Sequence, residues 1–155
     1  MNIIELKESL DISENGELGK IYTQFQMLLK ELRKKELPEK IVEFVNHDID
    51  DINSTSLTGK ELGKFIKQKQ TKIIKLLENE LKIVPKEYYQ NLWLALGICV
   101  FGLPVGVVFG SILDNMSLLA IGLPIGLAIG YAMGSRMDKK AFEEGRQLDM
   151  KLNIR

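Results

Sequence analysis

The sequence predicts an all-α protein in which a cytoplasmic helical hairpin or bundle precedes a two-helix transmembrane hairpin, with a short strand near the C-terminal end. Within residues 17–84, three stretches place apolar residues three and four positions apart, the spacing of helices with one buried face. Residues 92–135 then contain a single charge, Asp114, and divide into two apolar runs. A helix of about 20 apolar residues crosses a bilayer core, so each run is long enough to span it.

These changes in composition predict three regions. Residues 1–84 form a cytoplasmic amphipathic helical region, residues 85–135 form the transmembrane hairpin, with spans at about 92–113 and 116–135, and residues 136–155 form a cytoplasmic tail. The 21 basic and 21 acidic residues balance, so no overall positive field favours nucleic acid. We therefore expect no nucleic-acid partner.

Three helices are predicted in the first region. The first covers about residues 17–35, and the second has Pro38 in its first turn, where a missing N–H costs nothing. The third starts at a capping box between Thr58 and Glu61 and keeps its helical period as far as Val84. None of the three can bury its apolar face alone, so we expect them to pack together or against copies of the chain.

Shorter patterns mark the two ends of the chain. Residues 1–16 fit a short strand or a short helix. After Ser135 a helical extension is expected to reach about Gly145. From Leu148 to Ile154 apolar and polar residues alternate, which is typical of a half-buried strand, and its partner would be the N-terminal segment or another subunit.

Aromatic and basic residues mark the predicted membrane boundaries. Aromatic residues gather where the charges stop, basic residues return after Ser135, and the turn around Asp114 has none. The predicted membrane-interface residues are Tyr88, Tyr89, Trp93, Tyr131, Arg136, Lys139 and Lys140. The excess of basic residues on the terminal side predicts a multi-pass protein of the cytoplasmic (inner) membrane with both termini in the cytoplasm.

Both apolar runs contain glycines four residues apart, with a proline between the first two. The predicted helix-packing residues are Gly102, Gly106, Gly110, Gly122, Gly126, Gly130 and Gly134, and the predicted helix kinks are Pro104 and Pro124. Residues four apart lie on one side of a helix, so the glycines would form two smooth faces that permit close helix contact in lipid. Each proline removes a backbone hydrogen bond, which would leave the carbonyl of Val100 or Ala120 without its usual donor.

The pattern Gly102-x-x-x-Gly106-x-x-x-Gly110, followed by its counterpart from Gly122 to Gly134, resembles that of bacterial glycine-zipper membrane proteins. The chain is most similar to small two-span bacterial proteins of unassigned role, over about residues 85–147. The resemblance implies close helix packing and homo-oligomers, and it is compatible with channels, pore formers and simple anchors alike.

The sequence shows no pattern typical of an enzyme, a cofactor site or a metal site. The only histidine, His47, lies among aspartates, and a metal there would need ligands from other segments, so we expect an exposed acidic helix face. Cys99 is expected to be a buried apolar side chain. The lysines from Lys60 to Lys82 are expected to form a solvated face, with contact to anionic headgroups as the alternative.

These features together predict a non-enzymatic membrane protein that associates with copies of itself through its glycine faces and presents a helical interaction module. Its expected partners are the lipid bilayer, further copies of the chain and a cytoplasmic protein. Two alternatives stay open: a homo-oligomeric channel or pore, and a membrane-acting toxin or defence effector.

Overall fold

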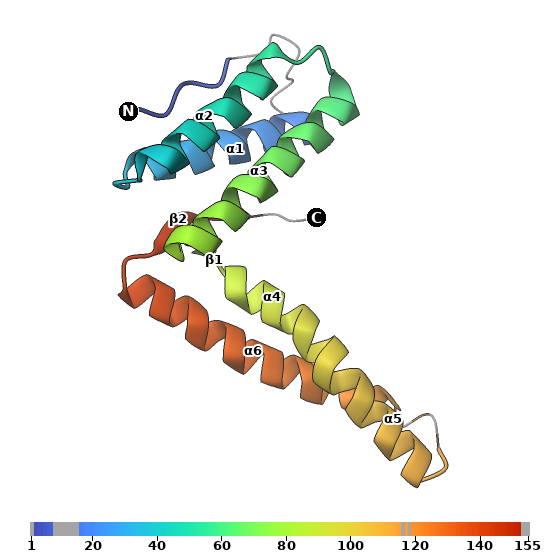
Figure 1. The fold of residues 1–155 in the computed structure, drawn as a ribbon. Helices are drawn as coiled ribbons and strands as arrows, with labels where there is room; N and C mark the ends of the chain where they lie inside the picture. Colours follow the sequence, from blue (N-terminus) through green and yellow to red (C-terminus); the bar gives the residue numbers. More distant parts are fainter. Residues whose placement is uncertain (1, 8–15, 116, 118, 153–155) are drawn as a thin grey trace. The chain divides into compact units, whose positions relative to one another are not determined.

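The computed structural model describes residues 2–7, 16–115, 117 and 119–152. The described residues divide into two compact units: residues up to Val84 together with Leu148–Leu152, and residues from Pro85 to Gln147. The structure is mostly helical, which confirms the predicted class, and it also contains a short parallel two-stranded sheet (Figure 1).

The first unit contains three helices: α1 (Glu17–Arg33), α2 (Glu39–Ser54) and α3 (Gly59–Leu81). Both α1 and α2 pack on α3. The predicted apolar faces meet in its core, where the largest fully buried side chains include those of Phe25, Leu28, Leu32, Ile49, Ile66, Ile73 and Leu77. The helical spacing of these residues in the sequence is thus the reason that the three helices share a core.

The start and the end of α3 differ from the prediction. Thr58 precedes the helix but makes no side-chain capping hydrogen bond, so the expected capping box is not formed. The helix ends at Leu81 and does not continue to Val84, because Lys82 adopts a left-handed conformation (φ 54°). The N–H of Lys82 donates to the carbonyl of Glu78 at 3.1 Å, the bond of an αL C-cap, and the N–H of Ile83 donates to the carbonyl of Leu77 at 3.2 Å.

The predicted C-terminal strand is present as β2 (Gln147–Lys151), in which Leu148 and Met150 are buried. Its partner was predicted wrongly: β2 pairs with β1 (Val84–Lys86), whose first residue was assigned above to the end of the third helix. Three residues carry too little alternation to be recognised as a strand, and only the pairing with β2 defines them. Residues 153 and 154 of the predicted strand lie outside the described residues.

In the second unit, one continuous helical run precedes a turn and a second long helix. The run consists of α4 (Tyr88–Leu96), the π-helix η1 (Gly97–Gly102) and α5 (Leu103–Ile112). Beyond it, Asp114 has a left-handed conformation (φ 48°), and the N–H of Asn115 donates to the carbonyl of Gly110 at 3.0 Å. Helix α6 (Leu119–Glu143) returns alongside α4, η1 and α5 (Figure 1).

Of the helices in the described part of the chain, one is long and apolar enough to cross a membrane: the 25-residue run Tyr88–Ile112. The prediction of two such helices is therefore corrected. The apolar part of α6 covers only residues 119–135, and the same helix continues through Arg136 and Asp138 to Glu143. Within the predicted tail, residues 136–143 continue α6 and Gln147–Lys151 form β2, and the assignment of residues 136–155 to a cytoplasmic tail stays a prediction.

Candidate functional site

The glycines of the second unit bring the backbones of its two long helices into contact. A methyl group added to Gly126 would lie 2.5 Å from the carbonyl oxygen of Gly97 and 2.7 Å from the backbone nitrogen of Gly102. One added to Gly122 would lie 2.5 Å from the nitrogen of Gly106. These contacts are with backbone atoms, so no side-chain rotation could make room for the methyl group.

The same arrangement repeats along α6 toward its polar end. The positions that a Cβ would take at Gly130 and Gly134 are filled by the backbone of α4, at Trp93 and at Tyr89 and Gln90. As residue numbers rise along α6, those of its contacts fall, so the two helices are antiparallel. This contact extends from Gly134 to Gly122, which makes the glycine faces the seam of an intrachain helix pair.

Between residues 91 and 136, burial in this helix pair follows the glycines alone. Among the described residues between 91 and 136, the buried ones are Gly97, Gly102, Gly106, Gly110, Gly122, Gly126, Gly130 and Gly134. The large apolar side chains point outward, and Val100, Val108 and Ile112 are among the most exposed, at 55%, 54% and 74%. In a helix pair surrounded by water, the large apolar side chains are buried at the contact and polar side chains face outward. Here glycine lies inside and leucine, valine and phenylalanine lie outside, which is the reverse pattern.

Gly97 belongs to the seam although the four-residue spacing did not predict it. It lies five residues before Gly102, which in an α-helix would turn it away from the glycine face. The π-helix η1 adds one residue to this turn, and the N–H of Leu103 donates to the carbonyl of Ile98, five residues back. Pro104 follows the π-helix. In a regular α-helix its ring would clash with the carbonyl of Val100, and the wider π-turn lies at this position.

The backbone differs at the two predicted kinks, Pro104 and Pro124. Pro104 follows the π-helix within the first run, whereas Pro124 lies inside α6, which is a single helix from Leu119 to Glu143. The sequence shows both prolines in the same context, and only the backbone distinguishes them.

A buried carboxylate joins the two helices at the end of the pair where α4 begins, which we call its base. Asp138 of α6 is 8% exposed and accepts hydrogen bonds from the N–H groups of Tyr89, at 3.1 Å, and Gln90, at 2.9 Å. These are among the first N–H groups of α4, which have no partner within their own helix. Glu87, which precedes α4, makes no side-chain capping bond, so Asp138 caps α4 from another helix and places a negative charge at its positive end.

We expect Asp138→Ala to lower the free energy of unfolding of the helix pair by about 1–2 kcal/mol, the usual cost of removing a cap. Asp138→Asn should lie between this variant and the wild type, because its side-chain oxygen still accepts one hydrogen bond. Denaturant titration in detergent, followed by the fluorescence of the single tryptophan, Trp93, measures the difference. Exposed Lys139→Ala is the matched control, and an equal loss there would contradict the capping role.

The predicted interface residues lie around this base and on α6. The rings of Tyr88 and Tyr89 meet edge to face at 5.3 Å, and the indole N–H of Trp93 lies 2.9 Å from the sulfur of Met137. Tyr131 is 53% exposed. Arg136 is exposed, and Lys139 and Lys140 lie 3.8 Å from Glu143 and Glu144, one helical turn on.

Cys99 differs from the prediction, because its side chain lies on the exposed face of η1 and is not buried. The π-helix and the glycine seam turn it outward together with Val100 and Phe101.

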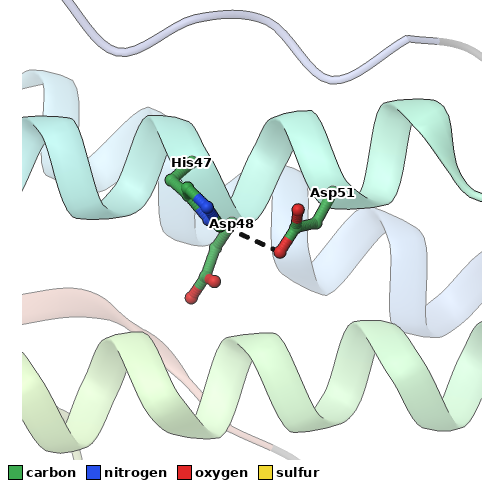
Figure 2. Close-up of side chains that lie close together, drawn as sticks. All are labelled: His47, Asp48 and Asp51. Carbon is green, nitrogen blue, oxygen red and sulfur yellow. Dashed lines mark ion pairs between the residues drawn. The ribbon is translucent and has the colours of Figure 1, made fainter.

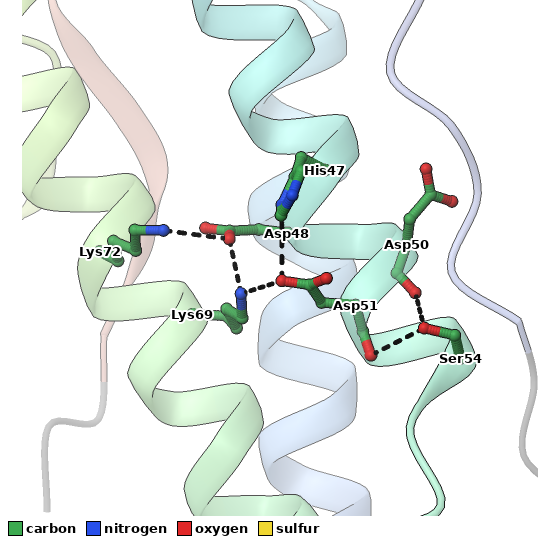
Figure 3. A network of polar contacts seen from close by, with 7 residues as sticks. All are labelled: His47, Asp48, Asp50, Asp51, Ser54, Lys69 and Lys72. Carbon is green, nitrogen blue, oxygen red and sulfur yellow. Dashed lines mark hydrogen bonds and ion pairs between the residues drawn. The ribbon is translucent and has the colours of Figure 1, made fainter.

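A second polar cluster lies in the first unit, between α2 and α3. Asp48 is fully buried, and its Oδ1 atom lies 2.8 Å from the ammonium group of Lys69 and 3.4 Å from that of Lys72. Lys69 also pairs with Asp51, which in turn lies 3.4 Å from the imidazole of His47. Figure 3 shows both lysines reaching from α3 toward Asp48, so the predicted exposed acidic face is wrong at this position.

Lys69 departs from the predicted solvated face, whereas Lys72 stays exposed, as predicted. The side chain of Lys69 is 13% exposed, and its ammonium group lies over the ring of Phe65 as well as beside the two carboxylates. Lys72 lies 4.4 Å from the ring centre of Phe44. Both side chains therefore serve the contact between α2 and α3.

Three potential metal ligands meet in this cluster, although the sequence predicted no metal site. His47, Asp48 and Asp51 present ligand atoms within 4.8 Å of one another (Figure 2). The ammonium group of Lys69 already bridges the two carboxylates, so a cation would have to displace it. We therefore interpret the cluster as an ion-pair network that joins two helices.

The charges of this network define a pH range of full stability. Hydrogen bonding to Lys69 lowers the pKa of Asp51, so its contribution is present above the ordinary aspartate pKa of about 3.9 and is lost as the pH falls through the folded-state pKa. Burial lowers the pKa of Lys69, but hydrogen bonds to Asp48 and Asp51 outweigh it and raise the pKa overall. The lysine contribution is therefore present below its ordinary pKa of about 10.4 and is lost above it.

We expect the free energy of unfolding to be flat near neutral pH and to fall below about pH 4. In Asp51→Asn the acid branch should be shallower, because one of the carboxylates that must be protonated is missing. Urea titrations followed by helical circular dichroism at several pH values measure this. An unchanged acid branch in the variant would contradict the role given to Asp51.

Comparison of the chain with protein-family models, curated proteins and solved structures gave no match.

Proposed function

We propose that the protein is a non-enzymatic, membrane-anchored interaction protein. Its second unit inserts into the bilayer as an antiparallel helix pair, and its first unit presents a helical binding module in the cytoplasm. The observation that carries this proposal is the inverted burial of the helix pair, with glycines at the seam and large apolar side chains on the outside.

The dimensions of the helix pair support insertion. At about 1.5 Å per residue, the 25 residues from Tyr88 to Ile112 are longer than the roughly 30 Å thickness of a hydrocarbon core. In lipid, outward apolar side chains carry no penalty, and close packing of small residues becomes the main attraction between helices. A continuous helix also satisfies its own backbone groups, as a membrane requires.

We further propose that α6 crosses the same bilayer. Its apolar part, residues 119–135, is at the short end of the range that spans a membrane, but it follows the first helix along the whole seam. Arg136, Lys139 and Lys140 would then lie at the surface where α4 begins, and Asp114 at the opposite surface. The basic residues favour the cytoplasm for the first of these surfaces.

Alkaline extraction combined with cysteine labelling tests the proposal. Membranes from bacterial cells that express the chain should retain it in carbonate and release it in detergent. In a Cys99→Ala background, Asn115→Cys should react with an impermeant maleimide in intact spheroplasts, whereas exposed Glu36→Cys should react only after permeabilisation. Release by carbonate, or protection of position 115 in spheroplasts, would overturn it.

Self-association belongs to the proposal, but at another surface than the glycine faces. Each glycine has room for one neighbouring backbone, and at Gly102, Gly122 and Gly126 that backbone belongs to the same chain. A second copy would therefore meet outward residues such as Val107 and Val108. Crosslinking in mild detergent decides between the surfaces: glycine-mediated assembly requires that Gly106→Leu disperse the oligomer while Trp93 fluorescence stays unchanged.

A further inference from the structure

A short extended segment lies on the first unit, where its main chain makes hydrogen bonds to the helices and two of its side chains are buried. Residues 2–7 contact two asparagines of α2, and each asparagine makes one hydrogen bond to a carbonyl and one to an N–H of the segment. The side-chain amide of Asn46 donates to the carbonyl of Asn2 at 3.0 Å and accepts from the N–H of Ile4 at 2.9 Å. That of Asn53 donates to the carbonyl of Glu5 at 3.1 Å and accepts from the N–H of Lys7 at 2.9 Å.

The two asparagines repeat the same contact three residues further along the segment. They are seven residues apart in α2, which places them on one face of the helix and about 10.5 Å apart along its axis. Three extended residues cover about 10 Å, so the spacing of the asparagines matches the advance of the peptide. Between the paired contacts, the apolar side chains of Ile3 and Leu6 are buried, at 8% exposure each.

Helix α1 supplies the other wall, and its polar contacts also reach main-chain atoms. The guanidinium of Arg33 donates to the carbonyls of Ile3, at 3.3 Å, and Ile4, at 2.9 Å, and the hydroxyl of Tyr22 donates to the carbonyl of Lys7. Main-chain hydrogen bonds give affinity that does not depend on the peptide sequence, whereas buried side chains at set positions give selectivity.

The surface holds space that the segment does not fill. A pocket of about 600 Å³ lies beside Asn2 and Ile3 and is lined by Leu32, Leu37 and Val42, among others. Another, of about 240 Å³, lies beside Lys7 and Asn53. A peptide with a larger side chain than that of Ile3 could therefore use the same backbone contacts and bury more apolar surface.

We propose that this surface is a peptide-binding site for an extended segment of a partner protein with two aliphatic side chains three residues apart, and that residues 2–7 occupy it in cis. This deepens the proposed function, because it assigns a partner class to the helical module, but it does not depend on membrane insertion. Because residues 2–7 belong to the same chain as the site, a partner peptide displaces them only when its concentration divided by its dissociation constant exceeds the effective concentration of the cis segment divided by the dissociation constant of that segment.

Binding of a fluorescein-labelled peptide with the sequence Asn-Ile-Ile-Glu-Leu-Lys, acetylated and amidated, tests the site. The full-length chain in detergent carries Ile3→Asp and Leu6→Asp, which remove the cis anchors, and circular dichroism verifies that its helices are retained. We expect saturable binding by fluorescence anisotropy, at least tenfold tighter than to the wild type. Adding Asn46→Ala and Asn53→Ala should weaken binding at least tenfold, whereas exposed Asp50→Ala should leave it unchanged.

A second measurement avoids the released variant. Millimolar unlabelled peptide added to the wild-type chain should speed hydrogen exchange at the amides of Ile4 and Lys7, since the cis segment is displaced. Absence of binding to the released variant, or binding that ignores both asparagines, would overturn the proposal. So would wild-type dimers that dissociate in Asn46→Ala/Asn53→Ala without peptide binding, because the occupant would then be a second copy. None of these outcomes affects the carbonate extraction that tests the membrane anchor.

Discussion

Replacing Gly126 by leucine should separate the two long helices of the second unit, which is the largest effect that we expect from a single substitution. The added Cβ alone would lie 2.5 Å from the carbonyl oxygen of Gly97 and 2.8 Å from the Cα of Gly102. Inserting carbon atoms into a packed interface costs about 1–3 kcal/mol even where side chains can adjust, and here the neighbours are backbone atoms. We expect a loss of at least about 3 kcal/mol for leucine and a smaller loss for Gly126→Ala.

The single tryptophan reports this separation, because Trp93 lies in the seam region of α4, next to Gly130 and Met137. Its emission and its denaturant midpoint in detergent should both change in Gly126→Leu. Ala128→Leu is the matched control, since Ala128 is exposed on the same helix two residues away. Equal behaviour of the two variants would show that the glycine seam does not hold the helices together.

Replacing Lys69 by methionine should destabilise the first unit by about 3–5 kcal/mol, because it leaves a buried carboxylate without its nearest cation. Asp48 is fully buried, and after the change only the ammonium group of Lys72, at 3.4 Å, would face it. Among the described residues, its Oδ2 atom already has no hydrogen-bond partner, so the carboxylate has no other group to which it can turn.

Removing both charges should restore most of the stability, because a buried ion pair contributes little more than apolar residues of similar size. We therefore expect Asp48→Leu/Lys69→Met to be more stable than Lys69→Met in urea titrations followed by circular dichroism. Lys75→Met, on the exposed face of α3, is the control and should change stability by less than about 0.5 kcal/mol. A loss in Lys69→Met no larger than in this control would show that Asp48 does not depend on the lysine.

Much of the fold follows from repeated spacing in the sequence. Apolar residues three and four apart predicted α1, α2 and α3, and the alternation after Leu148 predicted β2. The length of the first apolar run likewise predicted a helix able to cross a membrane. Such patterns depend only on neighbours within one or two turns, so each segment carries its own signal.

The misses share a different cause. Gly97 reaches the seam only through the extra residue of a π-helix, and β1 becomes a strand only by pairing with residues more than sixty positions away. Asp48 looked like a surface residue because no local pattern shows that two lysines of another helix cover it. In the sequence Asn46 and Asn53 are ordinary polar residues of a helix, and only the structure shows that an extended segment binds to both.

The sequence by itself determined which residues form helices and where the apolar runs lie, because these depend on side-chain spacing along one element. The tertiary structure alone decided which backbones touch through glycine, which carboxylates are buried and capped, and what the N-terminal segment binds. These contacts join residues far apart in the chain, and a hydrogen bond or an ion pair between them has no periodicity that a sequence can display.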